Sequence, residues 1–527
     1  MRPLYSPDRL PVRMIASGAA IMVGLWVLAS VFGPFGERTW AARADLVRNA
    51  FVHAYNGYRR QAFGHDEVRP VSGKVVDGFN AWAVSAVDGL DTMWLMGLGD
   101  MFEEAVDLVS QQTWAMGEKH AAPFFETTIR YLGGLLSAYA MSKVEHINDV
   151  LLYNSTYADG LYPSAFDLGT GAGKNFHFSA GAAADSAYEY LLKQWLVSGR
   201  SETRVRDHYI HSANAILANL AYVSPNRELL YVTDAIRKPA DKELTLPTDA
   251  DMQTARGRPS HNFEHLTCFL GGLLALGART VPDLDGREGE CWVSSGNFTR
   301  SALNAPHPTF TPRDRQLHMW AAEGLTETCW ATYADMPSGL GPDGVGVVSV
   351  RSFVEWRGLG TGGGPPTPWL VAVDKWERSG RPGGDKPPGA RPVEPIPADV
   401  ENRAQALDYK VRSNSWLLRP ETIESIYLLW RTTGDPVWRE RGWQLFQSME
   451  RWCRAEYGYS VVNQINTDHP RMTDEQPSWL FAETFKYLFL IFTDEDLLPL
   501  DKWVFNTEAH PLPVFEWRGW EREAYGI

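Results

Sequence analysis

Two carboxylates and a guanidinium group come close together in the segment Arg419-Pro420-Glu421-Thr422-Ile423-Glu424-Ser425. Pro420 favours a helix start, because the fixed φ of proline suits a first helical position. Apolar residues then recur at helical spacing as far as Trp430. Glu421 and Glu424 are therefore expected about one turn apart on neighbouring parts of one helix. Acids in a first turn can also simply complement the helix dipole, so this segment alone does not establish a site.

Two further segments place an acid where a helix is expected to begin. Glu126 precedes Arg130 by four residues, and an apolar helical face follows them. Ser186 and Glu189 have the spacing of a capping box, which predicts that Asp185 lies just outside a helix. Taken singly, each of these acids has an ordinary structural explanation as a cap, a partner of the helix dipole or part of a solvated face.

Aromatic and polar residues near the C-terminus extend this pattern. Trp479 and Glu483 are four residues apart, which places an aromatic ring beside a carboxylate on one expected helix. The polar segment 505–510 contributes further oxygen-bearing side chains, including Thr507 and Glu508. Carboxylates combined with arginines and aromatic rings are typical of carbohydrate chemistry. Glycosidic cleavage needs one acid to protonate the leaving oxygen and another to activate water.

Composition and charge limit the class of protein. The chain has 527 residues, of which 44% are hydrophobic, so it can bury one large core or two ordinary ones. A formal net charge of -14 has the wrong sign for a general nucleic-acid binder, so no nucleic-acid partner is expected. A neutral or cationic ligand suits this balance better.

An uncharged apolar stretch at residues 14–36 is long enough to cross a bilayer. We interpret it as a transmembrane signal-anchor that follows a cytoplasmic tail at 1–13 and precedes a stem at 37–46, with a cleaved signal peptide as the alternative. Arginines on both sides leave the orientation undecided by charge. Glycosylation sequons at Asn154 and Asn297, together with four cysteines in the same part of the chain, favour a lumenal domain and type II topology.

Helical periodicity dominates the rest of the chain and predicts an all-α fold. The segments 132–136 and 270–274 echo each other, each with paired glycines between leucines. Paired glycines weaken a helix unless another helix approaches closely there, so the echo suggests a repeated helix hairpin. Residues 380–397 contain six prolines and four glycines, which predicts a long mobile loop inside a disordered insertion around 358–400.

The order of these motifs resembles the class I α-1,2-mannosidases of glycoside hydrolase family 47 from about Val47 to Pro513. The similar segments are 64–70, 87–92, those around Phe125 and Asp185, 265–270, 419–425 and 506–510. The resemblance implies a barrel of seven helix hairpins, (αα)7, in a catalytic domain at 47–527. It also implies inverting hydrolysis of terminal α-1,2-linked mannose from high-mannose N-glycans, in the lumen of the endoplasmic reticulum or Golgi.

The resemblance also assigns roles to individual residues. It implies that Glu126 is the general acid, Glu421 the general base and Asp185 a third essential carboxylate. Thr507 would bind Ca²⁺ through its carbonyl and hydroxyl oxygens, which suits a cation that takes six to eight oxygen ligands. The remaining expected pocket residues are Arg130, His265, Arg419, Glu424, Glu483 and Glu508, with Trp479 stacking on mannose. Cys268 and Cys329 stand where the family has its disulfide, whereas Cys291 and Cys453 have no assignment.

One departure from the family concerns the interval between Tyr139 and Gly160. Only 20 residues separate these positions, where the family has several helices. We therefore expect the barrel to lack helices there, either in the protein itself or through a skipped coding segment, which puts activity in question. Two alternatives stay open: a degradation-enhancing mannosidase-like protein of the endoplasmic reticulum, and a non-catalytic glycan-binding relic.

Overall fold

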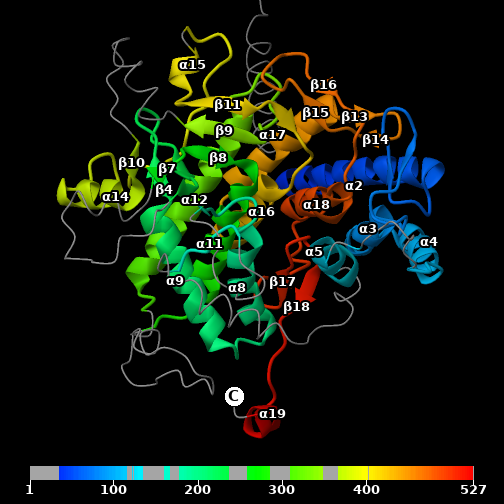
Figure 1. The fold of residues 1–527 in the computed structure, drawn as a ribbon, viewed down its shortest axis with the longest axis horizontal. Coiled ribbons are helices and arrows are strands. Elements are labelled where there is room, and N and C mark those ends of the chain that lie inside the picture. Colours follow the sequence, from blue (N-terminus) through cyan, green and yellow to red (C-terminus); the bar gives the residue numbers. More distant parts are fainter. Residues whose placement is uncertain are drawn as a thin grey trace, which may run out of the picture.

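Helices packed against one another form the framework of the computed structural model (Figure 1). The structure describes residues 35–114, 122, 124–133, 160–165, 177–236, 258–284, 309–347, 366–401 and 403–525. The longer helices are α2 (Phe35–Gln61), α3 (Val84–Leu95), α4 (Gly99–Ser110), α8 (Asp185–Val197), α9 (Thr203–Asn219), α11 (Phe269–Thr280), α12 (Pro312–Ala334), α14 (Trp369–Arg378), α16 (Glu421–Thr433), α17 (Val437–Trp452) and α18 (Phe485–Phe492). Shorter ones are α5 (Phe124–Glu126), η1 (Thr127–Leu132), η3 (His265–Cys268), α15 (Arg403–Ala406), η5 (Leu480–Thr484) and α19 (Gly519–Tyr525).

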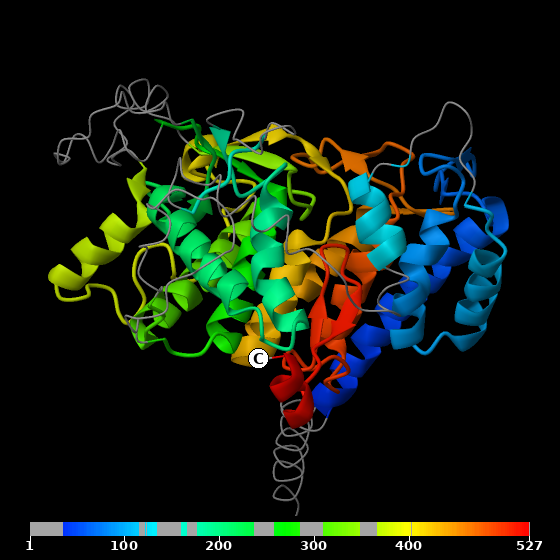
Figure 2. The same ribbon diagram turned by 60° about the horizontal axis from the view of Figure 1, so that its bottom comes forward.

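Helices that follow one another around the molecule pack in pairs. α11 packs against α12 and α16, α16 packs against α17 and α18, and α18 packs against α2. α3 pairs with α4, and α8 pairs with α9. The hairpin formed by β17 (Trp503–Phe505) and β18 (Pro511–Pro513) lies among these helices (Figure 2). Phe505 in this hairpin contacts the rings of Tyr427 in α16 and Tyr487 in α18. The helix-rich architecture agrees with the prediction from periodicity.

Short antiparallel sheets, which the all-α prediction overlooked, connect these helices. They are β1 (Glu67–Val68) with β2 (Val75–Val76); β10 (Thr367–Pro368), β4 (Ala221–Val223) and β5 (Leu230–Val232); β11 (Tyr409–Ser413), β9 (Gly344–Val347) and β8 (Asn262–Glu264); β12 (Ser415–Trp416), β15 (Val462–Asn463) and β16 (Arg471–Met472); β13 (Arg454–Ala455) with β14 (Gly458–Tyr459); β3 (His177–Phe178), β6 (Ala235–Ile236) and β7 (Arg258–Pro259); and the β17–β18 hairpin. Strands of two to five residues are too short to show a clear alternation of polar and apolar residues.

Local sequence signals set the ends of the helices. α12 begins with a capping box, in which Thr311 accepts from the Asp314 backbone N–H and Asp314 accepts from the Thr311 backbone N–H. α16 begins one residue after Pro420, whose carbonyl accepts the first helical hydrogen bond, from Glu424. The helix ends at Gly434, which has a positive φ of 71° and suits a left-handed C-terminal position.

The first described helix changes the expected domain boundary. α2 is continuous from Phe35, so residues 37–46 are helical and are not a separate stem. Trp40 stacks on Phe492 with 6.1 Å between ring centroids, and Arg43 forms an ion pair with Glu440 at 3.1 Å. The expected tail, and the expected anchor as far as residue 34, lie outside the described residues. No helix in the described part of the chain has the length and apolar character needed to span a membrane.

Residues 380–397 contain no helix or strand, but specific contacts hold them in place, which differs from the expected mobile loop. Arg391 pairs with Glu228 at 3.0 Å and donates to the Pro382 carbonyl at 2.8 Å. Trp369 donates to the Pro388 carbonyl at 3.1 Å. Side-chain and backbone hydrogen bonds thus replace regular structure here. The part of the insertion before residue 366 lies outside the described residues.

Close helix contacts explain the paired glycines of α11. A Cβ on Gly271 would lie 2.3 Å from Thr326 Oγ1, and one on Gly272 would lie 2.7 Å from Leu428 Cδ1. The Gly272 N–H donates to Ser425 Oγ at 2.7 Å, so α11 and α16 meet almost backbone to backbone. The Cys268–Cys329 disulfide joins the start of α11 to α12 with 6.0 Å between the Cα atoms, which confirms the expected pairing. Cys453 is free and buried, whereas Cys291 and both sequons lie outside the described residues.

We expect Gly272→Ala to lower the melting temperature, because the added methyl group has no room between α11 and α16. Overpacking a filled core typically costs about 1–3 kcal/mol. Scanning calorimetry measures the loss. The control is Gly99→Ala in α4, where an added Cβ meets no atom within 4 Å and no loss is expected. An equal drop in both variants would show that close packing is not the reason for the glycine.

Candidate active site

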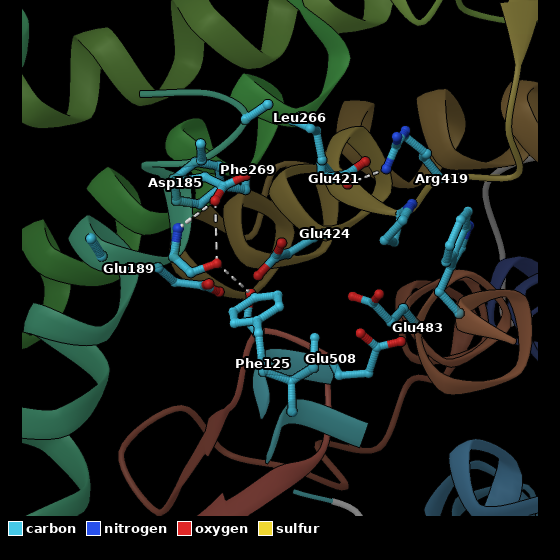
Figure 3. A pocket seen from close by; sticks show the side chains of 18 of the residues that line it. Phe125, Asp185, Glu189, Leu266, Phe269, Arg419, Glu421, Glu424, Glu483 and Glu508 are labelled. Atoms are coloured by element: carbon cyan, nitrogen blue, oxygen red, sulfur yellow. Dashed lines mark hydrogen bonds and ion pairs between the residues drawn. The ribbon is translucent and has the colours of Figure 1, made fainter. Parts of the chain in front are cut away.

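One cavity of about 640 Å³ brings together side chains from segments that are far apart in the chain (Figure 3). Ten of the eleven residues predicted to react, bind sugar or bind metal line it: Glu126, Arg130, Asp185, Arg419, Glu421, Glu424, Trp479, Glu483, Thr507 and Glu508. The eleventh, His265, lies behind Glu421 and contacts it directly. Asp185 and Glu421 are the first residues of α8 and α16, so each carboxylate sits at the positive end of a helix dipole.

Two basic residues flank the Glu421 carboxylate. Its Oε2 lies 2.9 Å from His265 Nδ1, and its Oε1 lies 3.8 Å from Arg419 Nη1. Burial works to raise the pKa of Glu421, but the hydrogen bond with His265 and the charge of Arg419 hold it below its usual value. Arg419 in turn donates to Asp343 Oδ1 at 2.8 Å, which holds the guanidinium in place. Glu421 is therefore kept ionised and able to accept a proton.

Arg130 is the centre of a second ionic cluster, in which it contacts three acids. Its Nε donates to Glu126 Oε2 at 2.7 Å, its Nη1 lies 3.2 Å from Asp88 Oδ2, and Nη1 also pairs with Glu508. Burial would lower the pKa of Arg130, but these three carboxylates raise it above its ordinary value. Asp88 was not predicted as a site residue. Its position in the segment 87–92, one of the segments that resemble the family, is the signal that could have identified it.

Both cavity-lining π-helical turns carry charged residues of the site. Arg130 lies in η1, and Glu483 lies in η5. A π-helical turn is wider than an α-helical turn and is frequent at functional sites. The residue pattern around Arg130 and Glu483 does not predict a π-helical turn. Sequence reasoning therefore placed both residues on helices without describing their geometry.

The start of α8 differs from the prediction. The helix begins at Asp185 itself, and Ser186 and Glu189 do not form a capping box. Asp185 Oδ1 instead accepts from the Ser186 backbone N–H at 2.7 Å. Burial raises the pKa of Asp185 to about 6, against the effect of the hydrogen bonds from Ser186. Glu189 is turned inward, where it pairs with Lys193.

Lys193 and Glu189 are site residues that sequence reasoning missed. Lys193 is buried, pairs with Glu189, lies 3.6 Å from Glu424 Oε1 and donates to the Asn506 carbonyl at 3.3 Å. It thereby ties α8 to α16 and to the turn between β17 and β18. A glutamate and lysine four residues apart are visible in the sequence, but this spacing usually marks an exposed helix pair.

The turn of the β17–β18 hairpin holds Thr507 at the cavity. Asn506 Oδ1 accepts from the backbone N–H groups of Glu508 at 2.9 Å and His510 at 2.8 Å. Asn506 Nδ2 donates to the Ile129 carbonyl at 3.1 Å, which fixes the turn to η1. Thr507 Oγ1 lies 3.5 Å from Ser186 Oγ, beside Asp185. The turn is thus held by its own hydrogen bonds and by two helices.

The charge balance of the cavity suits a cation. Seven carboxylates line it, those of Glu126, Asp185, Glu189, Glu421, Glu424, Glu483 and Glu508, against the guanidinium groups of Arg130 and Arg419. Burial raises the pKa of Glu424 to about 7 and that of Glu483 well above its usual value. Among the described residues, no three His, Cys, Asp or Glu side chains form a direct metal site. A hard cation would therefore take oxygens from Thr507, water and a ligand.

Trp479 forms an aromatic wall between the two arginines. The Arg419 guanidinium carbon lies 5.6 Å from the centroid of the indole ring, and that of Arg130 lies 5.8 Å from it. The indole Nε1 donates to the Leu417 carbonyl at 3.1 Å, which fixes the plane of the ring. A fixed indole on the wall of a polar cavity is suited to stacking on a sugar ring.

Comparisons with known proteins identify a matching family and a similar fold. The model of glycosyl hydrolase family 47 matches residues 50–156 and 143–514. Mannosyl-oligosaccharide alpha-1,2-mannosidase IA of Drosophila melanogaster is 28% identical, over 93% of this chain and 70% of the fly protein. Endoplasmic reticulum mannosyl-oligosaccharide 1,2-alpha-mannosidase of Homo sapiens is 30% identical, over 90% of this chain and 64% of the human protein. The solved alpha-1,2-mannosidase from Trichoderma reesei shares the fold, with a TM-score of 0.62 at 23% identity, covering 90% of this chain and 99% of that one.

We expect Glu424→Gln to improve stability more at pH 8 than at pH 5. The unfolded chain releases this proton near pH 4.3, whereas the folded protein holds it up to about pH 7. The ionised carboxylate therefore costs folding free energy as the pH rises through this interval, and glutamine removes that cost. The melting temperatures of the wild type and of Glu424→Gln, measured at both pH values in the presence of a chelator, give the difference. A difference that is the same at both pH values would contradict the raised pKa.

Proposed function

The chain belongs to glycosyl hydrolase family 47, and on this premise we propose that it hydrolyses terminal α-1,2-linked mannose from high-mannose N-glycans. The observation that carries the proposal is the Glu421 carboxylate, kept ionised at the wall of a cavity that also contains Glu126 and Asp185. The names of the similar fly and human proteins support the same substrate.

Each carboxylate would take a separate part in an inverting reaction. Glu421 would remove a proton from the attacking water, because its pKa lies below the usual value and its partners leave it an acceptor. Glu126, hydrogen-bonded to Arg130 and in part exposed to the cavity, would protonate the leaving oxygen. Asp185, with a pKa of about 6, is the third acid whose ionisation depends on conditions near neutral pH. Trp479 would stack on the mannose ring.

Calcium is proposed as the cofactor. The excess of carboxylates over guanidinium groups and the hydroxyl of Thr507 at the cavity support a bound divalent cation. Thr507 would hold it through hydroxyl and carbonyl oxygens, which suits Ca²⁺ better than the strict octahedron of Mg²⁺. A bound cation would polarise sugar hydroxyls and offset the repulsion among the acids.

The finer architecture and location are also part of the proposal. We expect an (αα)7-type barrel with fewer helices than usual between Tyr139 and Gly160, an interval in which the two family matches meet. We further propose an N-terminal anchor, type II topology and a lumenal catalytic domain in the endoplasmic reticulum or Golgi. The name of the human relative and the disulfide support a secretory compartment.

We expect Glu421→Gln to reduce mannose release by about 10²–10⁴-fold while the fold is retained, because glutamine cannot accept a proton from water. Release from a high-mannose oligosaccharide is followed by NMR, which also reports the anomer of the first product. The control is Glu440→Gln, an exposed acid in α17 that pairs with Arg43 away from the cavity. Retained activity in Glu421→Gln, or a product with retained configuration, would exclude the assigned mechanism. Binding of the oligosaccharide by the wild type without turnover would favour the glycan-binding relic.

Chelation should abolish mannose release, and Ca²⁺ should restore it more effectively than Mg²⁺. Thr507→Val should weaken Ca²⁺ binding in calorimetric titration, whereas Thr507→Ser keeps the hydroxyl and should bind Ca²⁺ more tightly than the valine variant. Full activity after exhaustive chelation, with no metal found by elemental analysis, would rule out the calcium proposal.

A further inference from the structure

Glu421 is the end of a hydrogen-bonded chain that leads away from the cavity into the core. Beyond the contact between Glu421 and His265 Nδ1, the other ring nitrogen, Nε2, lies 2.6 Å from Tyr333 Oη. Trp416 Nε1 lies 3.0 Å from the same tyrosine oxygen. His265, Tyr333 and Trp416 are all buried, at 4%, 1% and 1% exposure. Water therefore does not replace these contacts.

The direction of this chain follows from what each group can donate. An indole N–H only donates, so Trp416 uses an acceptor position of Tyr333 Oη. Burial raises the pKa of Tyr333, so the phenol keeps its proton and can donate it to the partner that lies nearest. The acceptor at 2.6 Å is His265 Nε2, which is then unprotonated. The imidazole proton is left on Nδ1, where it points at the Glu421 carboxylate.

Thr422 is a second partner of His265 and is the weaker one by distance. Its Oγ1 lies 3.1 Å from His265 Nε2, against 2.6 Å for Tyr333 Oη. If Nε2 carried the proton, both hydroxyls could act as acceptors and Nδ1 would be free to turn its lone pair toward the carboxylate. That arrangement places two acceptors face to face at 2.9 Å. The hydrogen bond from Tyr333 therefore determines whether His265 Nδ1 is a donor or an acceptor beside Glu421.

The fold holds the members of the chain at fixed separation. His265 lies in η3, Tyr333 in α12, Trp416 in β12 and Glu421 in α16. The disulfide joins Cys268, three residues after His265, to Cys329, one helical turn before Tyr333. The two elements that must keep the 2.6 Å contact are thus covalently tied beside it.

We infer that Tyr333 and Trp416 are positioning residues that fix the His265 proton on Nδ1, so that Glu421 is always presented as a hydrogen-bonded carboxylate acceptor. The inference rests on the proposed role of Glu421 as the general base. Neither residue lines the cavity, so neither touches the substrate. Their loss should slow the reaction without weakening substrate binding.

The test compares Tyr333→Phe and Trp416→Phe with Tyr409→Phe as a matched control. Tyr409 is equally buried and donates to Asp335 at 2.8 Å, outside this chain. In Tyr333→Phe we expect kcat to fall about tenfold, part of the 10²–10⁴-fold effect of a general base, with KM within about twofold. Trp416→Phe should reduce kcat less, and Tyr409→Phe should leave both constants unchanged.

A spectroscopic measurement tests the proton position independently of turnover. In ¹⁵N-histidine-labelled protein, the signals lost in His265→Gln identify His265. We expect the wild type to show a protonated Nδ1 and a bare Nε2, and Tyr333→Phe to lose this pure tautomer. A wild type with the proton on Nε2, or a Tyr333→Phe variant with unchanged tautomer and kcat, would overturn the inference. A wild type that shows the expected tautomer but releases no mannose would count against the proposed function and leave the proton assignment supported.

Discussion

Seven carboxylates around one cavity impose the constraint on which the rest of the structure depends. Like charges removed from water repel one another strongly, because the low local dielectric does not screen them. The fold meets this constraint by distributing fixed positive groups among the acids. Arg130 contacts Glu126, Asp88 and Glu508, Lys193 contacts Glu189 and Glu424, and Arg419 lies beside Glu421, which also has a hydrogen bond with His265.

These positive groups are distributed unevenly, and the acids therefore differ in pKa. Glu421 has two cationic or donating neighbours and a lowered pKa, whereas burial dominates at Asp185, Glu424 and Glu483 and raises theirs. Acids whose pKa values are shifted in opposite directions differ in protonation in the same cavity at the same pH. A bound cation would favour the ionised form of the acids whose pKa is raised, which is the physical argument for a metal ion among them.

Secondary structure positions these groups through unusual local geometry. The first residues of α8 and α16 carry Asp185 and Glu421, two π-helical turns carry Arg130 and Glu483, and a hairpin turn carries Thr507. Residues at helix starts and in turns lie at the ends of elements. Side chains from several elements can therefore point into the same cavity. The disulfide and the glycines of α11 bring α11, α12 and α16 close enough behind the cavity to anchor this arrangement.

The sequence by itself determined the helical character, the family and the membership of the site, because helical periodicity and ordered motifs are local properties of the chain. Ten predicted residues line the cavity, and the expected disulfide is present. Tertiary structure alone decided which acids are ionised, because a pKa depends on burial and on partners as distant in sequence as Glu421 and His265. It also turned Glu189 and Lys193 inward, brought in Asp88 and Tyr333, and anchored residues 380–397. Spacing along the chain shows which side chains share a helix face. Only packing shows what that face meets.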